Sequence, residues 1–133
     1  MVKGRCALVM VLSLLAAIPV LGQLGVIEKG EPTTIRGEVV EISCYQSKGI
    51  AAGTGSSHVA CAKECAAKGR QLGVLTEGDG LFRIVGSLTA DNHATLIPHL
   101  GQTVDVFGAQ VVLSNTYDIR QNFEAQTITP VKN

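Results

Sequence analysis

Three cysteines and one histidine occur within one short stretch, Cys44 to Gly69, and these residue types can bind a metal ion. His58, Cys61 and Cys65 follow one another at spacings of three and four residues. Residues three, four and seven apart share one helix face, so the thiols of Cys61 and Cys65 would point the same way. His58 would lie near that face at the helix entrance, and Cys44 could reach the same point from the end of a strand. Three thiols and an imidazole suit zinc, or copper(I), which soft thiolates favour.

A disulfide is the main alternative use of these cysteines, and it would leave no metal bound. A bridge from Cys44 to Cys61 or Cys65 would close a loop of about 17 to 21 residues. In the chain-entropy model such a bridge contributes roughly 3 kcal/mol. A Cys61–Cys65 bridge within one helical turn fits disulfide geometry less well. The remaining thiol, near the helix N-terminus and His58, would then have a lowered pKa, which allows a thiol-redox role.

Residues 1–22 predict an export signal. Lys3 and Arg5 precede an apolar run at 7–18, which is shorter than the roughly 20 residues that span a bilayer. We expect cleavage before Gln23, a periplasmic or extracellular location, and no membrane span after cleavage. Cys6 is lost with the signal, and an odd number of thiols in an oxidising compartment favours a metal that engages all three.

The rest of the chain predicts a flexible lead-in (23–33) and one mainly β domain (34–133). Alternating apolar residues and turn signals, including Gly78-Asp79-Gly80, predict five strands. The expected strands are 34–43, 71–77, 81–87, 102–113 and 116–128. A glycine-rich loop (45–57) and a Cys-bearing helix (57–68) are expected between strands one and two. A second helix (91–100) is expected between strands three and four. This order predicts a five-stranded Greek-key barrel of the oligonucleotide/oligosaccharide-binding (OB) type.

The remaining polar residues give no catalytic signature. There is no Ser-His-Asp order, no pair of catalytic carboxylates and no phosphate-binding loop, so we expect a binding function more than an enzyme. Basic and acidic residues are balanced at eleven each and aromatics are few, which disfavours nucleic acid as a partner. We expect Glu38 and Glu41 to face solvent, His93 and His99 to be surface histidines, and Tyr45 to form a wall of the inserted segment.

Two motifs carry a resemblance over most of residues 34–128. The first is Gly37-Glu38-Val39-Val40-Glu41-Ile42-Ser43-Cys44 followed by His58-x-x-Cys61-x-x-x-Cys65-x-x-x-Gly69; the second is the GxxVxVxG strand at 101–108. Together they resemble small exported bacterial OB-fold-like proteins with a Cys…His-x-x-Cys-x-x-x-Cys insertion. The resemblance implies fold and export, and no defined reaction.

These observations lead to one main functional expectation and two alternatives. We expect an exported OB-like accessory module whose site, Cys44, His58, Cys61 and Cys65, holds zinc structurally or handles copper, as a subunit of a larger envelope complex. Four protein ligands leave no open position for a substrate. The alternatives are a disulfide-stapled OB module that binds a protein, glycan or oligonucleotide, and a thiol-redox protein.

Overall fold

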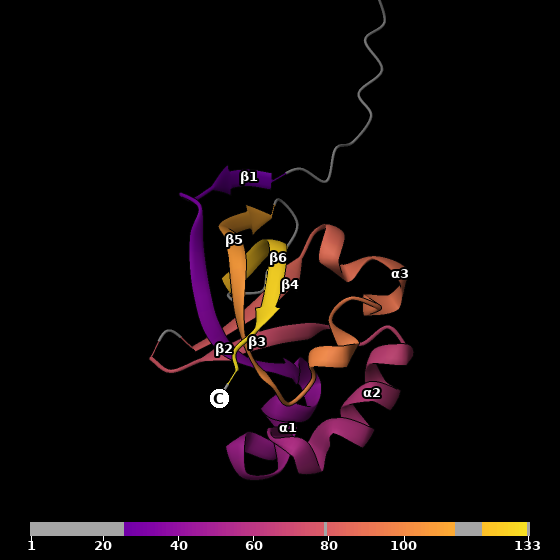
Figure 1. Ribbon diagram of the computed structural model, residues 1–133. Helices are drawn as coiled ribbons and strands as arrows, with labels where there is room; N and C mark the ends of the chain where they lie inside the picture. Colours follow the sequence, from indigo (N-terminus) through magenta and orange to yellow (C-terminus); the bar gives the residue numbers. More distant parts are fainter. Residues whose placement is uncertain (1–25, 79, 114–120, 133) are drawn as a thin grey trace, which may run out of the picture.

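The protein is a mixed α/β fold in which helices lie between the strands of a mostly antiparallel sheet (Figure 1). The computed structural model describes residues 26–78, 80–113 and 121–132. The predicted export signal, Asp79 and the beginning of the strand predicted at 116–128 lie outside these ranges. None of the helices in the described ranges is long and apolar enough to cross a membrane.

The elements alternate along the chain between strands and short helices. The strands are β1 (Val26–Lys29), β2 (Thr33–Glu41), β3 (Leu72–Thr76), β4 (Gly80–Val85), β5 (Thr103–Leu113) and β6 (Gln121–Pro130). The helices are α1 (Ile42–Gly53), α2 (Val59–Ala67) and α3 (Ala90–His93), with 3₁₀ turns η1 (Ser56–His58), η2 (Ser87–Thr89) and η3 (Ile97–His99).

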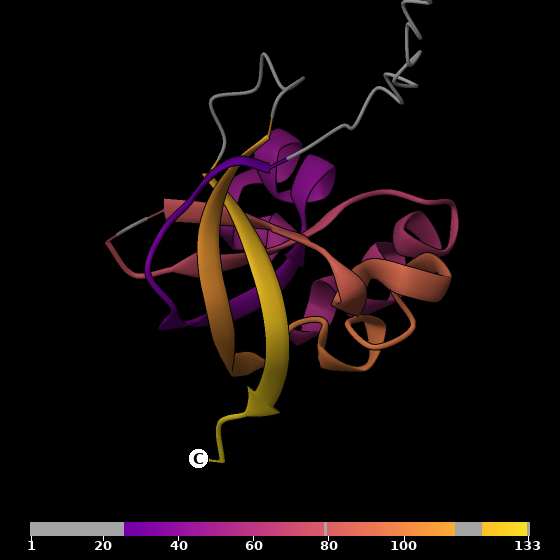
Figure 2. The same ribbon diagram turned by 90° about the horizontal axis from the view of Figure 1, so that it is seen from above.

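The hydrogen bonds of the sheet run in a ring through five strands. The order is β1-β5-β2-β3-β4-β6, and an additional β5–β6 pairing joins the last strand back to β5. Only the β4–β6 pair is parallel among the pairs that the structure describes. Figure 2 shows β5 and β6 as two long curved strands running side by side. Strand β1 pairs only with β5 and adds a short edge outside the ring.

The ring encloses an apolar core to which two segments outside the sheet also contribute. Phe82 and Phe123 meet edge to face with ring centroids 6.0 Å apart. The core cluster consists of Val39, Ala62, Ala66, Leu72, Val74, Phe82, Ile84, Leu96, Leu100, Val104, Val106, Phe123 and Ala125. Helix α2 is therefore attached to the sheet through its two buried alanines, and the segment between β4 and β5 through its two leucines.

Two glycines permit the close strand approach that the curved sheet requires. A Cβ atom at Gly37 would lie 2.2 Å from the carbonyl oxygen of Leu75, and one at Gly108 would lie 2.2 Å from that of Glu124. The pairing of β5 with β6 shifts register between Phe107 and Gly108, and a glycine in a strand is typical of such a bulge.

The segment 42–71 leaves and rejoins the sheet at one paired position. Glu41, the last residue of β2, pairs with Leu72, the first residue of β3. The amide of Ile42 donates a hydrogen bond to the carbonyl of Gln71 at 3.0 Å. The two ends of the inserted α1–η1–α2 segment are thus held together by the β2–β3 ladder.

Three predictions of local structure differ from what the structure shows. The predicted lead-in contains β1, which uses the free edge of β5. The predicted loop at 45–57 is mostly helix, because α1 runs through Gly53. Gly49 (φ 70°) introduces a kink in this helix and does not prevent helix formation. The predicted helix at 91–100 is instead a series of short turns, because residues 91–93 all take left-handed backbone angles.

The close approach at Gly37 predicts a specific loss of stability. Gly37→Ala would place a methyl group against the β3 backbone, so we expect the free energy of unfolding to fall by at least about 2 kcal/mol. Gly30→Ala is the matched control, because the nearest atom to its Cβ would be 3.5 Å away, an ordinary contact. Urea unfolding of both variants measures the difference. Equal stability of the two would show that β2 and β3 are not this close.

Candidate metal site

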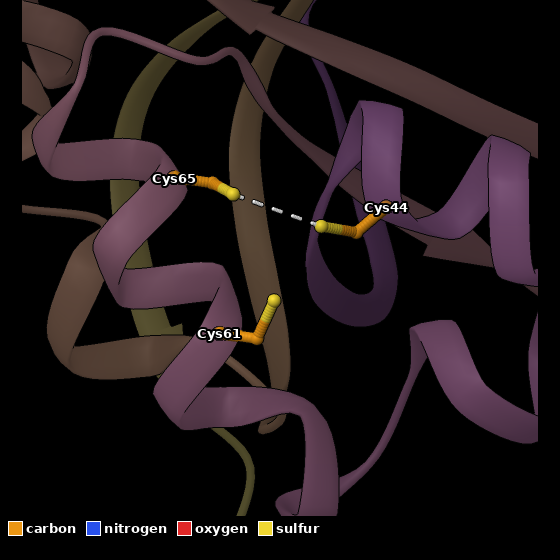
Figure 3. A group of neighbouring side chains, drawn as sticks. All are labelled: Cys44, Cys61 and Cys65. Carbon is orange, nitrogen blue, oxygen red and sulfur yellow. Dashed lines mark hydrogen bonds between the residues drawn. The ribbon is translucent and has the colours of Figure 1, made fainter.

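Three cysteine side chains from two helices converge on one point (Figure 3). Cys44 lies in the first turn of α1, and Cys61 and Cys65 lie one turn apart on α2. Their sulfur atoms all lie within 4.8 Å of one another. The Sγ atoms of Cys44 and Cys65 are 3.9 Å apart. Bonds of about 2.3 Å to a tetrahedral ion would place two sulfurs about 3.8 Å apart, so this spacing fits a shared metal ion.

The packing of α2 on the core determines where its two cysteines point. Ala62 and Ala66 are 2% and 0% exposed and form the buried stripe of the helix. Cys61 and Cys65 each precede one of these alanines by a single residue, which places them along the neighbouring face. That face is turned toward α1 (Figure 3). Gly69, which follows the C-cap residue Lys68, takes left-handed backbone angles (φ +82°), as is common directly after a helix.

Glu41 holds the other helix in place. The sequence pattern predicts that this residue faces solvent, but it is fully buried, and that prediction is wrong. Its carboxylate accepts hydrogen bonds from the amides of Ser43 (3.0 Å) and Cys44 (2.9 Å) and from the Ser43 hydroxyl. The carboxylate is therefore the N-cap of α1, where it also complements the helix dipole. The same hydrogen bonds position the backbone of Cys44, so this cysteine lies in a helix and not at a strand end.

Two opposing effects act on the carboxyl group of Glu41. Burial, the largest single effect, would raise its pKa. The hydrogen bonds from Cys44 and Ser43 together outweigh burial and lower the pKa below its ordinary value. A carboxylate that is buried and ionised at neutral pH thus lies beside the cysteine cluster.

The pKa of the Cys44 thiol shifts upward, in the opposite direction to that of Glu41. Burial, followed by the hydrogen bond and negative charge of Glu41 and by a smaller effect of Cys65, raises the pKa of the Cys44 thiol to about 12. Cys44 is therefore protonated at neutral pH in the absence of a metal, and a bound cation would have to displace this proton. A low-pKa thiol, which a thiol-redox role requires, is not supplied by Cys44.

The cluster has one exposed member. Cys44 is buried and Cys65 is half-buried, whereas Cys61 is exposed to solvent. The ammonium group of Lys48, one helical turn after Cys44 on α1, lies 3.8 Å from the Cys61 sulfur. The positive charge of Lys48 therefore lies beside the exposed member of the cluster.

His58 lies outside the group of atoms that converge. The residue ends η1 immediately before α2 and is buried, and its Nε2 atom has no hydrogen-bond partner among the described residues. The ligand atoms within 4.8 Å of one another come from the three cysteines alone within the described ranges. Participation of His58 in metal binding therefore stays a prediction. His93 and His99 are half-buried and lie outside the cluster as well.

An open groove of about 950 Å³ runs beside the inserted segment, between α1 and strands β2 and β3. Tyr45 and Ile50 line it from α1, as the sequence analysis expects for Tyr45, and Glu38 and Leu75 line it from the strands. Glu38 accepts a hydrogen bond from the Gly55 amide, which ties the end of α1 to β2.

Comparison with known proteins gives no match among protein-family models, curated proteins or solved structures. The chemistry open to the site follows from its atoms. Three sulfurs on two elements form a soft ligand set that could hold one metal ion. Two of the three sulfurs could instead form a disulfide, since the Sγ atoms of Cys44 and Cys65 lie 3.9 Å apart.

The buried cap predicts a pH-dependent contribution to stability. Because its pKa is lowered in the folded protein, Glu41 stabilises the fold above the ordinary glutamate range and loses this effect as the pH falls through the folded pKa. Glu41→Gln should cost about 1–2 kcal/mol at pH 7 in the metal-free protein, and the gap to wild type should shrink between pH 5 and pH 3. Denaturant unfolding across this range measures the gap. Glu77→Gln, at an exposed position, is the control, and a gap that stays constant with pH would contradict the cap.

The sulfur geometry predicts which disulfide forms under oxidation. Cys44 and Cys65 lie on different helices at 3.9 Å, whereas Cys61 and Cys65 lie within one helical turn. Mild oxidation of the metal-free protein by oxidised glutathione should therefore give mainly a Cys44–Cys65 bridge and leave Cys61 open to alkylation. Peptide mapping by mass spectrometry identifies the bridge. A dominant Cys61–Cys65 bridge would show that the helix does not hold its shape.

Proposed function

We propose that this protein is an exported accessory module that binds one thiophilic metal ion through Cys44, Cys61 and Cys65. The observation that carries the proposal is the convergence of three sulfurs, from two separate helices, within 4.8 Å of one another. Neither helix brings the site together alone. Each is held by its own interaction with the sheet, the Glu41 cap for α1 and the alanine stripe for α2.

Copper(I) is the ion that the ligand set supports best. Thiolates are soft ligands that favour copper(I), and this ion accepts three of them without a fourth ligand. Zinc prefers four ligands in a tetrahedron. It becomes the resident ion if the buried His58 ring turns its unpartnered Nε2 atom toward the cluster, which gives the Cys₃His set of the sequence analysis.

We assign the domain to an OB-like Greek-key barrel with the cysteine-bearing helices inserted between its first two strands. The ring of pairings β5-β2-β3-β4-β6, closed by β5–β6 and containing one parallel pair, supports this assignment. In this assignment β1 is an addition at the edge of the barrel.

The position of the cysteines supports metal carriage over a purely structural ion. The core cluster that holds the five-strand ring together contains none of the three cysteines. Loss of the ion would therefore loosen the packing of α1 against α2 and leave the ring intact. An exported carrier of this kind would act with a protein partner in a larger envelope complex.

Metal titration tests the proposal directly. Reduced protein should bind one equivalent of copper(I), and replacement of Cys44, Cys61 or Cys65 by Ser should lower the affinity at least about 10-fold, the cost of losing even an outer-shell partner. Ala60→Ser, at an exposed neighbour on α2, should not change it. Competition against a chromogenic copper(I) chelator measures these affinities.

The His58 side chain separates the two candidate ions. His58→Ala should leave copper(I) affinity unchanged and should weaken zinc binding if the ring is the fourth zinc ligand. Failure of the wild-type protein to protect its thiols from alkylation after loading with either ion would contradict metal binding altogether.

A further inference from the structure

The three sulfurs differ in their access to solvent, and this asymmetry bears on how an ion would be exchanged. Cys44 is 7% exposed, follows the buried Glu41 cap, and lies next to the sheet. Cys65 is half-buried, and Cys61 is exposed. A competing ligand would therefore reach a bound ion most readily from the side of the cluster on which Cys61 lies.

The same side carries a positive charge. The ammonium group of Lys48 lies 3.8 Å from the Cys61 sulfur, and the lysine is exposed. The two ion pairs within the described ranges involve other lysine and arginine residues on the sheet. The charge of Lys48 is thus available to an anion that approaches Cys61.

We propose that the bound ion is exchanged at Cys61, and that Lys48 attracts an acceptor that presents a thiolate flanked by further negative charge. This inference rests on the proposed metal binding and names the partner chemistry of the same site. Cys61 is the exposed ligand, whereas Cys65 is half-buried and Cys44 is buried, so the acceptor would attack the ion beside Cys61.

The exchange is a sequence of ligand substitutions in which no electron is transferred. The acceptor thiolate forms a bond to the ion, the bond from the ion to Cys61 breaks, and Cys61 leaves as a thiolate beside the Lys48 ammonium. Two further donor atoms of the acceptor then bind the ion, as the bonds to Cys65 and then to Cys44 break. The released thiolates exchange protons with water, and the ion keeps its oxidation state.

The experiment compares two chromogenic copper(I) chelators that differ in charge. Purified protein loaded anaerobically with one equivalent of copper(I) is mixed with bathocuproine disulfonate, which is anionic, or with neocuproine, which is neutral. Stopped-flow absorbance follows the transfer. We expect rates proportional to chelator concentration for both, because the acceptor attacks the bound ion.

The effect of Lys48 on the transfer rate is measured by comparing the anionic with the neutral chelator. In low salt, Lys48→Gln should slow transfer to the anionic chelator by about 3- to 10-fold and leave transfer to the neutral one unchanged. Lys68→Gln, which removes an exposed lysine from the far end of α2, should change neither rate. High salt should abolish the advantage of wild type over Lys48→Gln.

The outcomes separate this inference from the proposed function. If the protein does not load with copper(I), both fail. If it loads but the transfer rates do not depend on chelator concentration, or if Lys48→Gln and Lys68→Gln have equal effects, metal binding stands and exchange at Cys61 under the charge of Lys48 is overturned.

Discussion

The hydrogen bonds of one buried carboxylate connect the sheet to the candidate metal site. Glu41 is the last residue of β2 and pairs with the first residue of β3, so its backbone belongs to the sheet. Its side chain caps α1 and holds the amide of Cys44. A buried carboxylate is costly unless it is fully hydrogen-bonded, and here the start of a helix supplies the donors. Without this cap, the first turn of α1 would have free amides and Cys44 would have no defined position.

The second cysteine-bearing helix is held by a different force. Helix α2 has no side-chain cap at its N-terminus, and its first residues follow directly from η1. Its position comes from burial of Ala62 and Ala66 against the sheet, where small side chains allow close approach of the helix. Two independent anchors, one polar and one apolar, thus bring Cys44 to Cys61 and Cys65. This arrangement lets the ion site form without contributing to the main core.

Separation of the site from the core has a functional consequence. Structural metal ions are usually tied to folding, because a site that is absent in the unfolded chain converts binding energy into folding energy. In this protein the five-strand ring buries its own apolar cluster, and the cysteines lie on an insertion beside it. Under the proposed function, an ion would be gained and lost at the insertion while the ring keeps its shape, which is the property that a carrier needs.

Local patterns in the sequence were sufficient for five of the six described strands and for the face of α2. The alternation in β2 and β5, the glycine hairpin between β3 and β4, and the i, i+4 spacing of Cys61 and Cys65 depend only on backbone periodicity, and the structure shows each of them. Helix α1 was not predicted, because its glycine-rich sequence has low intrinsic helix propensity. It forms because a carboxylate caps it and Gly49 allows a kink at φ 70°.

The sequence by itself thus predicted five of the six described strands, the placement of two thiols on one helix face and the nature of the soft ligands. Tertiary structure alone decided that Glu41 is buried, that Cys44 lies within 3.9 Å of Cys65, and that Cys61 stays exposed beside Lys48. The physical reason is that periodicity is a property of neighbouring residues. The burial of Glu41 and the convergence of the three sulfurs depend on which distant segments pack together. Here the β2–β3 ladder and the packing of α2 on the core bring these segments together.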